Sequence, residues 1–183
     1  MVYCAVVRGP LGAGKTTVAR AVAEAVGGVV IPVDEILEFW EWDGGSELLF
    51  LRANEVVAAR ALPVLRSGRP VLVDGNFYWA SALEDLARRL ERPCVVLHLR
   101  VPLEQCIARD QRRSLSYGAE ATRAVFAKVG DVRGEINIDA SGTLEETVRA
   151  VLGHLPSLGS AERASSGAES PRTGRHEGSG AGR

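Results

Sequence analysis

The sequence has little of what marks a secreted or membrane protein. Only three of its 183 residues are cysteines, and none forms a close C-x-x-C pair, so neither a disulfide framework nor a zinc site is predicted. No run approaches the roughly 18 apolar residues that a membrane span needs, and the apolar run 2–7 is too short for a signal peptide. These absences favour a protein of the cytoplasm that does not associate with membranes.

The chain also lacks an excess of charge of either sign. Its 22 Lys and Arg residues against 23 Asp and Glu residues give a net charge of -1, so the composition disfavours binding to a long nucleic acid. Lysine itself is scarce, because only Lys15 and Lys128 are lysines and every other basic residue is arginine. A lysine at a particular site is therefore an informative choice.

The last part of the chain differs in composition from the rest. Residues 156–183 are mostly Gly, Ser, Ala, Pro and scattered charges, with no aromatic residue and Leu158 as the one large aliphatic residue. Such a segment buries too little apolar area to offset the entropy of ordering it, so we predict a disordered tail. A cleavable or partner-binding tail is the alternative. Residues 1–155 are predicted to form one domain.

Short apolar runs alternate with helical patterns within residues 1–155, which is typical of a parallel sheet with helical crossovers. The runs are continuous, which indicates strands buried on both faces. Strands are predicted at 2–7, 29–33, 71–73, 94–99 and 135–138, and helices at 15–26, 35–42, 46–67, 82–91, 103–116, 119–129 and 144–154. Capping boxes are expected at Ser81 with Glu84 and at Thr143 with Glu146, and Pro63 is expected to kink or split its helix.

The segment after the first predicted strand matches G-x-x-x-x-G-K-[ST] in full, as Gly9-Pro10-Leu11-Gly12-Ala13-Gly14-Lys15-Thr16. In this motif, backbone N–H groups and the positive end of the following helix hold phosphate oxygens. We expect Lys15 to contact the β- and γ-phosphates and the Thr16 hydroxyl to bind Mg²⁺. The alternative, a glycine-rich turn with a solvated lysine, is disfavoured because this chain uses arginine at nearly every other basic position.

This loop resembles that of the small P-loop kinases, the group that includes adenylate kinase, shikimate kinase, gluconate kinase, chloramphenicol phosphotransferase and polynucleotide 5′-kinase. The resemblance extends over about residues 1–155 and is most specific in the loop. It implies a three-layer α/β fold of the P-loop NTPase type, with a five-stranded parallel sheet of order 2-3-1-4-5 and helices on both faces. It also implies ATP and Mg²⁺ as cofactors.

Two predicted strands are followed by or end in an aspartate, Asp34 and Asp74. Ligands of open α/β sheets bind at the carboxyl ends of the strands, so both carboxylates are expected in the crevice that holds the loop. The resemblance implies that Asp34 contacts the acceptor hydroxyl and takes its proton, and it can also serve as the N-cap of a helix from Glu35. Asp74 resembles a Walker B residue that holds Mg²⁺ together with Thr16.

The alternative for Asp74 is a turn residue before Gly75. The string Asp74-Gly75-Asn76-Phe77 is also similar to the D-G-x-P-R segment of adenylate kinases, but Pro and Arg are missing. That departure disfavours a nucleoside monophosphate as acceptor.

Arginines cluster in the predicted helix 103–116. Arg109, Arg112 and Arg113 have the spacing of neighbours on one helical face. The resemblance implies a mobile lid over the triphosphate, in which Arg109 and Arg113 neutralise charge on the transferred phosphoryl group. A solvated charged face is the alternative.

Aromatic residues concentrate in two stretches, which hold Phe39, Trp40, Trp42 and Phe50 and then Phe77, Tyr78 and Trp79. In the resembling architecture these stretches flank the acceptor, and cavities for small organic molecules are lined mainly by apolar and aromatic groups. We therefore expect Trp40, Trp42, Asn76 and Tyr78 to contact a small hydroxylated acceptor, such as a nucleoside, an aminoglycoside-like sugar or an aromatic metabolite. Core packing is the alternative for at least half of the aromatic residues.

Two later features complete the prediction. Asn137-Ile138-Asp139 stands where these kinases approach adenine and is not the N-K-x-D motif that recognises guanine, so ATP is favoured over GTP. His98 lies in a predicted strand and is interpreted as a core histidine.

Together these features predict transfer of the γ-phosphoryl group of ATP to a hydroxyl of a small molecule. The residues assigned to the nucleotide are Gly9, Leu11, Gly12, Ala13, Gly14, Lys15, Thr16, Thr17 and Arg109. Lys15, Asp34, Arg109 and Arg113 are assigned to catalysis. A nucleotide-gated ATPase or regulatory module and a polynucleotide 5′-hydroxyl kinase are the alternative functions.

Overall fold

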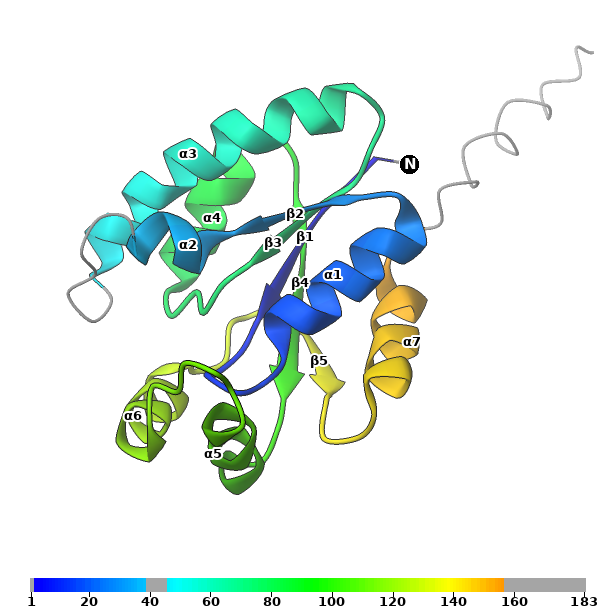
Figure 1. The fold of residues 1–183 in the computed structure, drawn as a ribbon. Coiled ribbons are helices and arrows are strands. Elements are labelled where there is room, and N and C mark those ends of the chain that lie inside the picture. The colour runs from blue at the N-terminus through cyan, green and yellow to red at the C-terminus, as the bar shows by residue number, and fades with distance from the viewer. Residues whose placement is uncertain (1, 39–45, 157–183) are drawn as a thin grey trace, which may run out of the picture.

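The computed structural model describes residues 2–38 and 46–156. They form a parallel sheet between two layers of helices (Figure 1). The strands are β1 (Cys4–Arg8), β2 (Val29–Pro32), β3 (Val71–Asp74), β4 (Cys94–Arg100) and β5 (Ile136–Asp139). Their order is β2-β3-β1-β4-β5, and every neighbouring pair is parallel. The predicted fold class and strand order are therefore confirmed.

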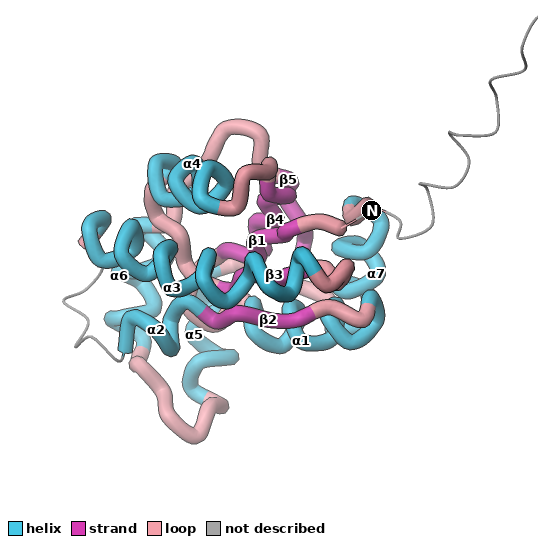
Figure 2. The backbone as a smooth tube through the Cα atoms, turned by 90° about the horizontal axis from the view of Figure 1, so that it is seen from above, coloured by secondary structure: helices cyan, strands magenta, loops and turns pink. Residues whose placement is uncertain are grey.

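Helices cover both faces of the sheet. The helices are α1 (Lys15–Val26), α2 (Val33–Glu38), α3 (Glu47–Arg66), α4 (Ala80–Arg89), α5 (Leu103–Gln111), α6 (Ala119–Lys128) and α7 (Leu144–His154). One layer contains α1 and α7, and the other contains α3 and α4 (Figure 1). Figure 2 shows α3 running along β3 and β2. α5 and α6 lie at the end to which the strand arrows point. Within the described residues, no helix is long and apolar enough to cross a membrane.

The central strands are buried on both faces, as their continuous apolar runs predict. Alternate residues of β1 belong to different cores: Cys4 and Val6 pack toward α3 and α4, whereas Ala5 and Val7 pack toward α1 and α7. Every residue of β1 and β3 is buried, but the edge strands β2 and β5 are partly exposed. The sheet thus holds the ends of β1 and β3 rigidly, where the glycine-rich loop and Asp74 follow.

One local prediction about the helices is confirmed, and two others are wrong. The capping box of Thr143 with Glu146 is confirmed at the start of α7. The capping box at Ser81 is wrong, because α4 begins at Ala80 and the Ser81 hydroxyl donates instead to Glu47. Pro63 does not split α3, which is continuous from Glu47 to Arg66 although the proline removes one helical hydrogen bond.

The predicted helix 103–116 ends early, at Gln111. The Asp110 carboxylate accepts hydrogen bonds from the Ser116 hydroxyl, at 2.7 Å, and from the Gly118 N–H, at 3.0 Å. These bonds fold residues 112–118 back into a turn that leads into α6. The predicted helix 35–42 corresponds to α2, and its second half lies outside the described residues. Residues 157–183 also lie outside them, so the disordered tail and the domain boundary stay predictions.

Candidate active site

The glycine-rich loop joins β1 to α1 and leaves the start of α1 open. Gly14 is the N-cap residue with a φ of 89°, a conformation that favours glycine. No side chain caps the helix and no acidic residue stands in its first turn, so its positive end is free to attract an anion. At Gly12, a Cβ atom would lie 2.1 Å from the Cys106 carbonyl oxygen, so glycine here lets the loop pack directly on α5.

Lys15, Thr16 and Asp74 lie together beside this loop. The Lys15 ammonium is buried and donates to the Pro10 carbonyl at 3.1 Å. Asp74, at the end of β3, is only 2% exposed. Its Oδ1 atom has no hydrogen-bond partner. Burial raises the pKa of Asp74, although the Lys15 charge and the nearby Thr16 hydroxyl act in the opposite direction.

These groups fit a magnesium ion. Mg²⁺ prefers oxygen ligands, and the unpartnered Oδ1 of Asp74 and the hydroxyl of Thr16 are both oxygens at the mouth of a phosphate-binding loop. A cation beside Asp74 would also compensate the buried carboxylate. One carboxylate and one hydroxyl therefore form a donor set that suits Mg²⁺.

A cavity of about 540 Å³ brings most of the sequence-predicted residues together. The loop forms one wall, and side chains from α2, α5 and the start of α7 form the others. The predicted residues that line it are Leu11, Gly12, Ala13, Gly14, Lys15, Thr16, Thr17, Asp34, Asp74, Arg109 and Arg113. Gly9 does not line it. A Cβ atom at Gly9 would lie 2.9 Å from the Leu99 carbonyl oxygen, so this glycine allows close packing of the loop on β4.

Two of the three clustered arginines line the cavity. Arg109 donates through Nη2 to the Ala140 carbonyl at 2.9 Å, which fixes it to the loop after β5. The guanidinium carbon of Arg113 lies 5.8 Å from the centre of the Tyr117 ring, and Tyr117 lines the cavity too. Arg112 is exposed and does not line it.

Asp34 lines the cavity, but its position within the helix differs from the predicted one. α2 begins at Val33, so Asp34 stands in its first turn and is not the N-cap of a helix from Glu35. Its side chain lines the cavity. Burial and, secondarily, the charge of Asp34 raise the pKa of Tyr78, which places these two side chains near each other.

The other predicted acceptor contacts do not line this cavity. Asn76 and Tyr78 are buried, and the Asn76 amide donates to the Tyr78 hydroxyl at 3.2 Å. The Tyr78 ring packs edge-to-face with Phe50 and Trp79, at centroid distances of 5.8 and 5.4 Å, so these aromatic residues form core. Trp40 and Trp42 lie outside the described residues.

Sequence reasoning missed some residues that line the cavity: Arg20, Glu35, Tyr117, Thr143 and Thr147. Arg20 could have been found, because it stands four residues after Thr16 on the same face of α1. Tyr117 and Thr143 reach the cavity through turns whose course no periodicity predicts.

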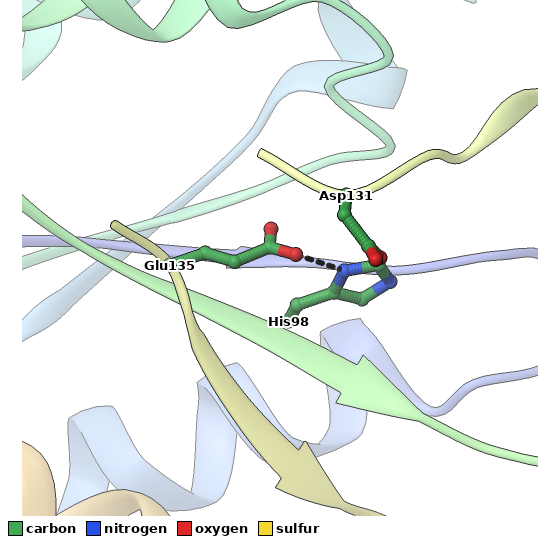
Figure 3. A group of neighbouring side chains, drawn as sticks. All are labelled: His98, Asp131 and Glu135. Atoms are coloured by element: carbon green, nitrogen blue, oxygen red, sulfur yellow. Dashed lines mark hydrogen bonds and ion pairs between the residues drawn. The ribbon is translucent and has the colours of Figure 1, made fainter. Parts of the chain in front are cut away.

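His98 is buried and belongs to a separate cluster with the exposed Asp131 and the partly buried Glu135 (Figure 3). The His98 Nδ1 atom lies 3.0 Å from a Glu135 carboxylate oxygen, and the two residues share a hydrogen bond. Potential metal-ligand atoms of all three lie within 4.8 Å of one another. However, Arg8 pairs with Glu135, and Arg100 pairs with Asp131. Because arginines already neutralise both carboxylates, the cluster is a structural ion-pair network, in agreement with a core histidine.

Comparisons with known proteins identify one family and one fold. A family model for an AAA domain, AAA_33, matches residues 5–136. No curated protein matches the chain. Among solved structures, it is similar to a gluconokinase from Sinorhizobium meliloti 1021, with a TM-score of 0.67 and 21% identity over 83% of this chain and 90% of the other.

Two further structures have the same fold. A sugar kinase from Janibacter sp. HTCC2649 has a TM-score of 0.69 and 19% identity, over 84% of this chain and 94% of the other. An APS kinase from Mycobacterium tuberculosis, in complex with AMPPNP and APS, has a TM-score of 0.63 and 16% identity, over 84% of this chain and 98% of the other. The similarity covers at least 90% of each of these three kinases and at least 83% of this chain.

Proposed function

Because this chain belongs to the AAA_33 family and has the fold of the small P-loop kinases, we propose that it transfers the γ-phosphoryl group of ATP to a hydroxyl of a small molecule. The observation that carries the proposal is that one cavity is lined both by residues 11–17 of the phosphate-binding loop and the start of α1 and by Asp34. A nucleotide and an acceptor therefore have room to meet within it.

The donor half of the reaction uses the loop and the arginines. Backbone N–H groups from Gly12 to Thr16 and the open start of α1 hold the phosphates, and Lys15 neutralises their charge. When bound, Mg²⁺ supplies further neutralisation of the phosphate oxygens, and Asp74 and Thr16 would hold it. Arg109 of α5 and Arg113, in the turn after it, line the same space and stabilise charge that develops on the transferred group.

Asp34 acts on the acceptor half. Its carboxylate accepts the proton of the attacking hydroxyl as the new oxygen–phosphorus bond forms and the bond to the ADP oxygen breaks. The products are the phosphorylated acceptor and ADP, and the proton then passes from Asp34 to solvent. The gluconokinase and sugar kinase among the similar structures support a hydroxylated metabolite as acceptor.

The test is a scan of hydroxylated metabolites for stimulated ADP release with Mg·ATP. Asp34→Asn should reduce acceptor-dependent turnover by about 10²- to 10⁴-fold, the range that a general base contributes, while calorimetry still detects nucleotide binding. Near-normal turnover in Asp34→Asn would remove this residue as the base. Steady ATP hydrolysis that no metabolite changes would favour a nucleotide-gated switch, and labelling of a 5′-hydroxyl oligonucleotide would favour a polynucleotide kinase.

A further inference from the structure

Two cysteines that lie far apart in the sequence are neighbours in the sheet. Cys4 is the first residue of β1 and Cys94 is the first residue of β4, and the register of these parallel strands sets the two directly opposite each other. Both side chains lie on the face that α3 and α4 cover. Adjacent strands are about 4.8 Å apart, and the Cα atoms of a disulfide are about 4.4–6.8 Å apart, so the backbone already allows the two residues to be joined.

The two thiols differ in their access to solvent. Cys4 is completely buried, whereas Cys94 is partly exposed. A small reagent that arrives from solvent therefore reaches Cys94 first. Cys4 lies beside it, protected from the same reagent but close enough to react with whatever forms on Cys94.

The surroundings of Cys94 favour its reactive form. The neighbouring Cys4 thiol lowers the pKa of Cys94 and the charge of Arg92 adds to this effect, although burial opposes both. Arg92 stands two residues before Cys94, and its buried Nε atom has no hydrogen-bond partner among the described residues. A positive group with an unused donor favours a thiolate, and the thiolate is the nucleophile in thiol chemistry. Contact with Cys94 and burial raise the pKa of Cys4.

Cys106 provides the contrast within the same chain. It is buried in the core on the other face of the sheet, where neither Cys4 nor Cys94 packs. Burial raises the pKa of its thiol. Cys106 is therefore expected to be inert, and it serves as an internal reference for the other two thiols.

We propose that Cys94 and Cys4 form a redox-sensitive pair, in which hydrogen peroxide oxidises Cys94 and Cys4 converts the product into a disulfide. In the first step the Cys94 thiolate attacks a peroxide oxygen, the O–O bond breaks, and Cys94 becomes a sulfenic acid while the second oxygen takes up a proton and leaves as water. In the second step the Cys4 sulfur attacks the Cys94 sulfur, the S–O bond breaks, and the hydroxyl leaves as water with the Cys4 proton. The two thiols lose two electrons in total, which reduce the peroxide.

The disulfide would join the starts of β1 and β4, away from the cavity. The phosphate-binding loop follows the other end of β1, and neither cysteine lines the cavity, so oxidation should leave nucleotide binding unchanged. A disulfide lowers the entropy of the unfolded chain, and this one closes a loop of about 90 residues. The oxidised protein should therefore be the more stable form.

The experiment treats the full chain with hydrogen peroxide, blocks the remaining thiols with iodoacetamide in denaturant and maps the tryptic peptides by mass spectrometry. The three cysteines fall on separate peptides, residues 1–8, 90–100 and 101–109. A link between peptides 1–8 and 90–100 that dithiothreitol removes is expected, with Cys106 alkylated. Alkylation of all three cysteines, a sulfonic acid at Cys94 without the link, or a link between two copies of peptide 90–100 would each overturn the proposal.

Single substitutions separate the roles of the two thiols. Cys4→Ala should leave Cys94 as a sulfenic acid that dimedone labels, whereas Cys94→Ala should leave Cys4 unoxidised. Cys106→Ala is the matched control and should form the link to the same extent as the wild type. Oxidation of Cys4 in Cys94→Ala at the rate of the wild type would overturn the assignment of Cys94 as the attacking thiol.

The melting temperature and nucleotide binding report what the link does. Oxidation should raise the melting temperature of the wild type by about 5–10 °C and that of Cys4→Ala not at all, because only the wild type can close the loop. Calorimetry with magnesium and a non-hydrolysable ATP analogue should give the same Kd for the reduced and the oxidised protein. An unchanged melting temperature in the linked wild type would overturn the stabilising role of the disulfide, and a Kd raised tenfold by oxidation would overturn its separation from the cavity.

Discussion

Two groups of buried charges flank the same loop, and they differ in how well their polar atoms are satisfied. Arg8, immediately before the loop, has partners for all three of its nitrogen atoms. Asp74, on the cavity side, leaves its Oδ1 atom without one. A buried polar group with every bond made stabilises the fold, whereas one with a bond missing is costly unless a ligand completes it. The comparison thus separates a charge whose hydrogen bonds are complete from one that lines the cavity with an unpartnered oxygen.

The Arg8 group ties together distant parts of the chain. Arg8 is completely buried, and its Nε donates to the Phe77 carbonyl at 3.1 Å and its Nη2 to the Gly130 carbonyl at 2.9 Å. Its Nη1 pairs with Glu135. Phe77 has a φ of 41°, which is strained for a residue with a side chain, and the bond from Arg8 holds its carbonyl. One side chain therefore joins the end of β1 to the loops after β3 and before β5.

Lys15→Ala should have the largest effect, and it acts on activity alone. Removing this ammonium should lower phosphoryl transfer by at least on the order of 10³-fold, because a preorganised charge at the reacting phosphates is lost. Thermal unfolding should change by no more than a few degrees. Coupled measurement of ADP release with circular dichroism melts would check both, and Lys128→Ala is the matched control at the chain's other lysine. A large loss of thermal stability in Lys15→Ala would contradict the distinction between the cavity charges and the Arg8 group.

Arg8→Met should have the opposite signature. Without Arg8, Glu135 loses its fully buried partner and keeps only Arg100 at 3.4 Å and His98 at 3.0 Å, so the free energy of unfolding should fall by up to about 3–5 kcal/mol. Urea unfolding measures this change, with Arg60→Met on the exposed surface of α3 as control. Adding Glu135→Gln to Arg8→Met should restore part of the loss, since the charge that lost this partner is removed. If the double variant is no more stable than Arg8→Met, the charge of Glu135 is not the reason for the loss.

These two groups also differ in how far the sequence predicts them. The loop motif is local, so the sequence alone placed Lys15 and Thr16. The apolar runs predicted the strands, and the family resemblance implied their order. The partners of Arg8 lie 69 to 127 residues away in the chain, and no periodicity or motif links them. α2 begins two residues before its predicted start, whereas α5 ends five residues before its predicted end because the Asp110 side chain, and not helical propensity, ends it.

Asp74→Asn should reduce activity but raise stability. Burial raises the pKa of Asp74, so the folded state binds its proton more strongly than the unfolded state does. The carboxyl therefore costs increasing stability as pH rises through its folded pKa, and the neutral amide avoids this cost. At pH 7.5 the melting temperature should rise by about 2–4 °C, equivalent to about 1 kcal/mol, and the gain should shrink toward pH 4.

Magnesium sharpens this prediction. Mg²⁺ with a non-hydrolysable ATP analogue should raise the melting temperature of the wild-type protein and raise that of Asp74→Asn less, because the cation loses a charged ligand. Differential scanning fluorimetry at both pH values provides the readings. A melting temperature of Asp74→Asn below that of the wild type at pH 7.5 would show that Asp74 is structurally satisfied, contrary to its unpartnered Oδ1 atom.

His98→Gln should have the smallest effect on stability, and it tests the Arg8 group. Burial lowers the pKa of His98, and the charge of Arg8 also lowers it, whereas the hydrogen bond that His98 donates to the Glu135 carboxylate raises it. The stability that neutral His98 provides is therefore present above its ordinary pKa of about 6.5 and is lost as pH falls through the lower folded pKa. Glutamine cannot take up that proton. Melts from pH 7.5 to 5 should show the wild type losing about 1 kcal/mol more than His98→Gln, while His154→Gln, exposed at the end of α7, should follow the wild type. If the melting temperatures of all three proteins fell in parallel with pH, protonation of His98 would not destabilise the Arg8 group. A charge change in that group would then have as little effect on stability as the one expected for Lys15→Ala.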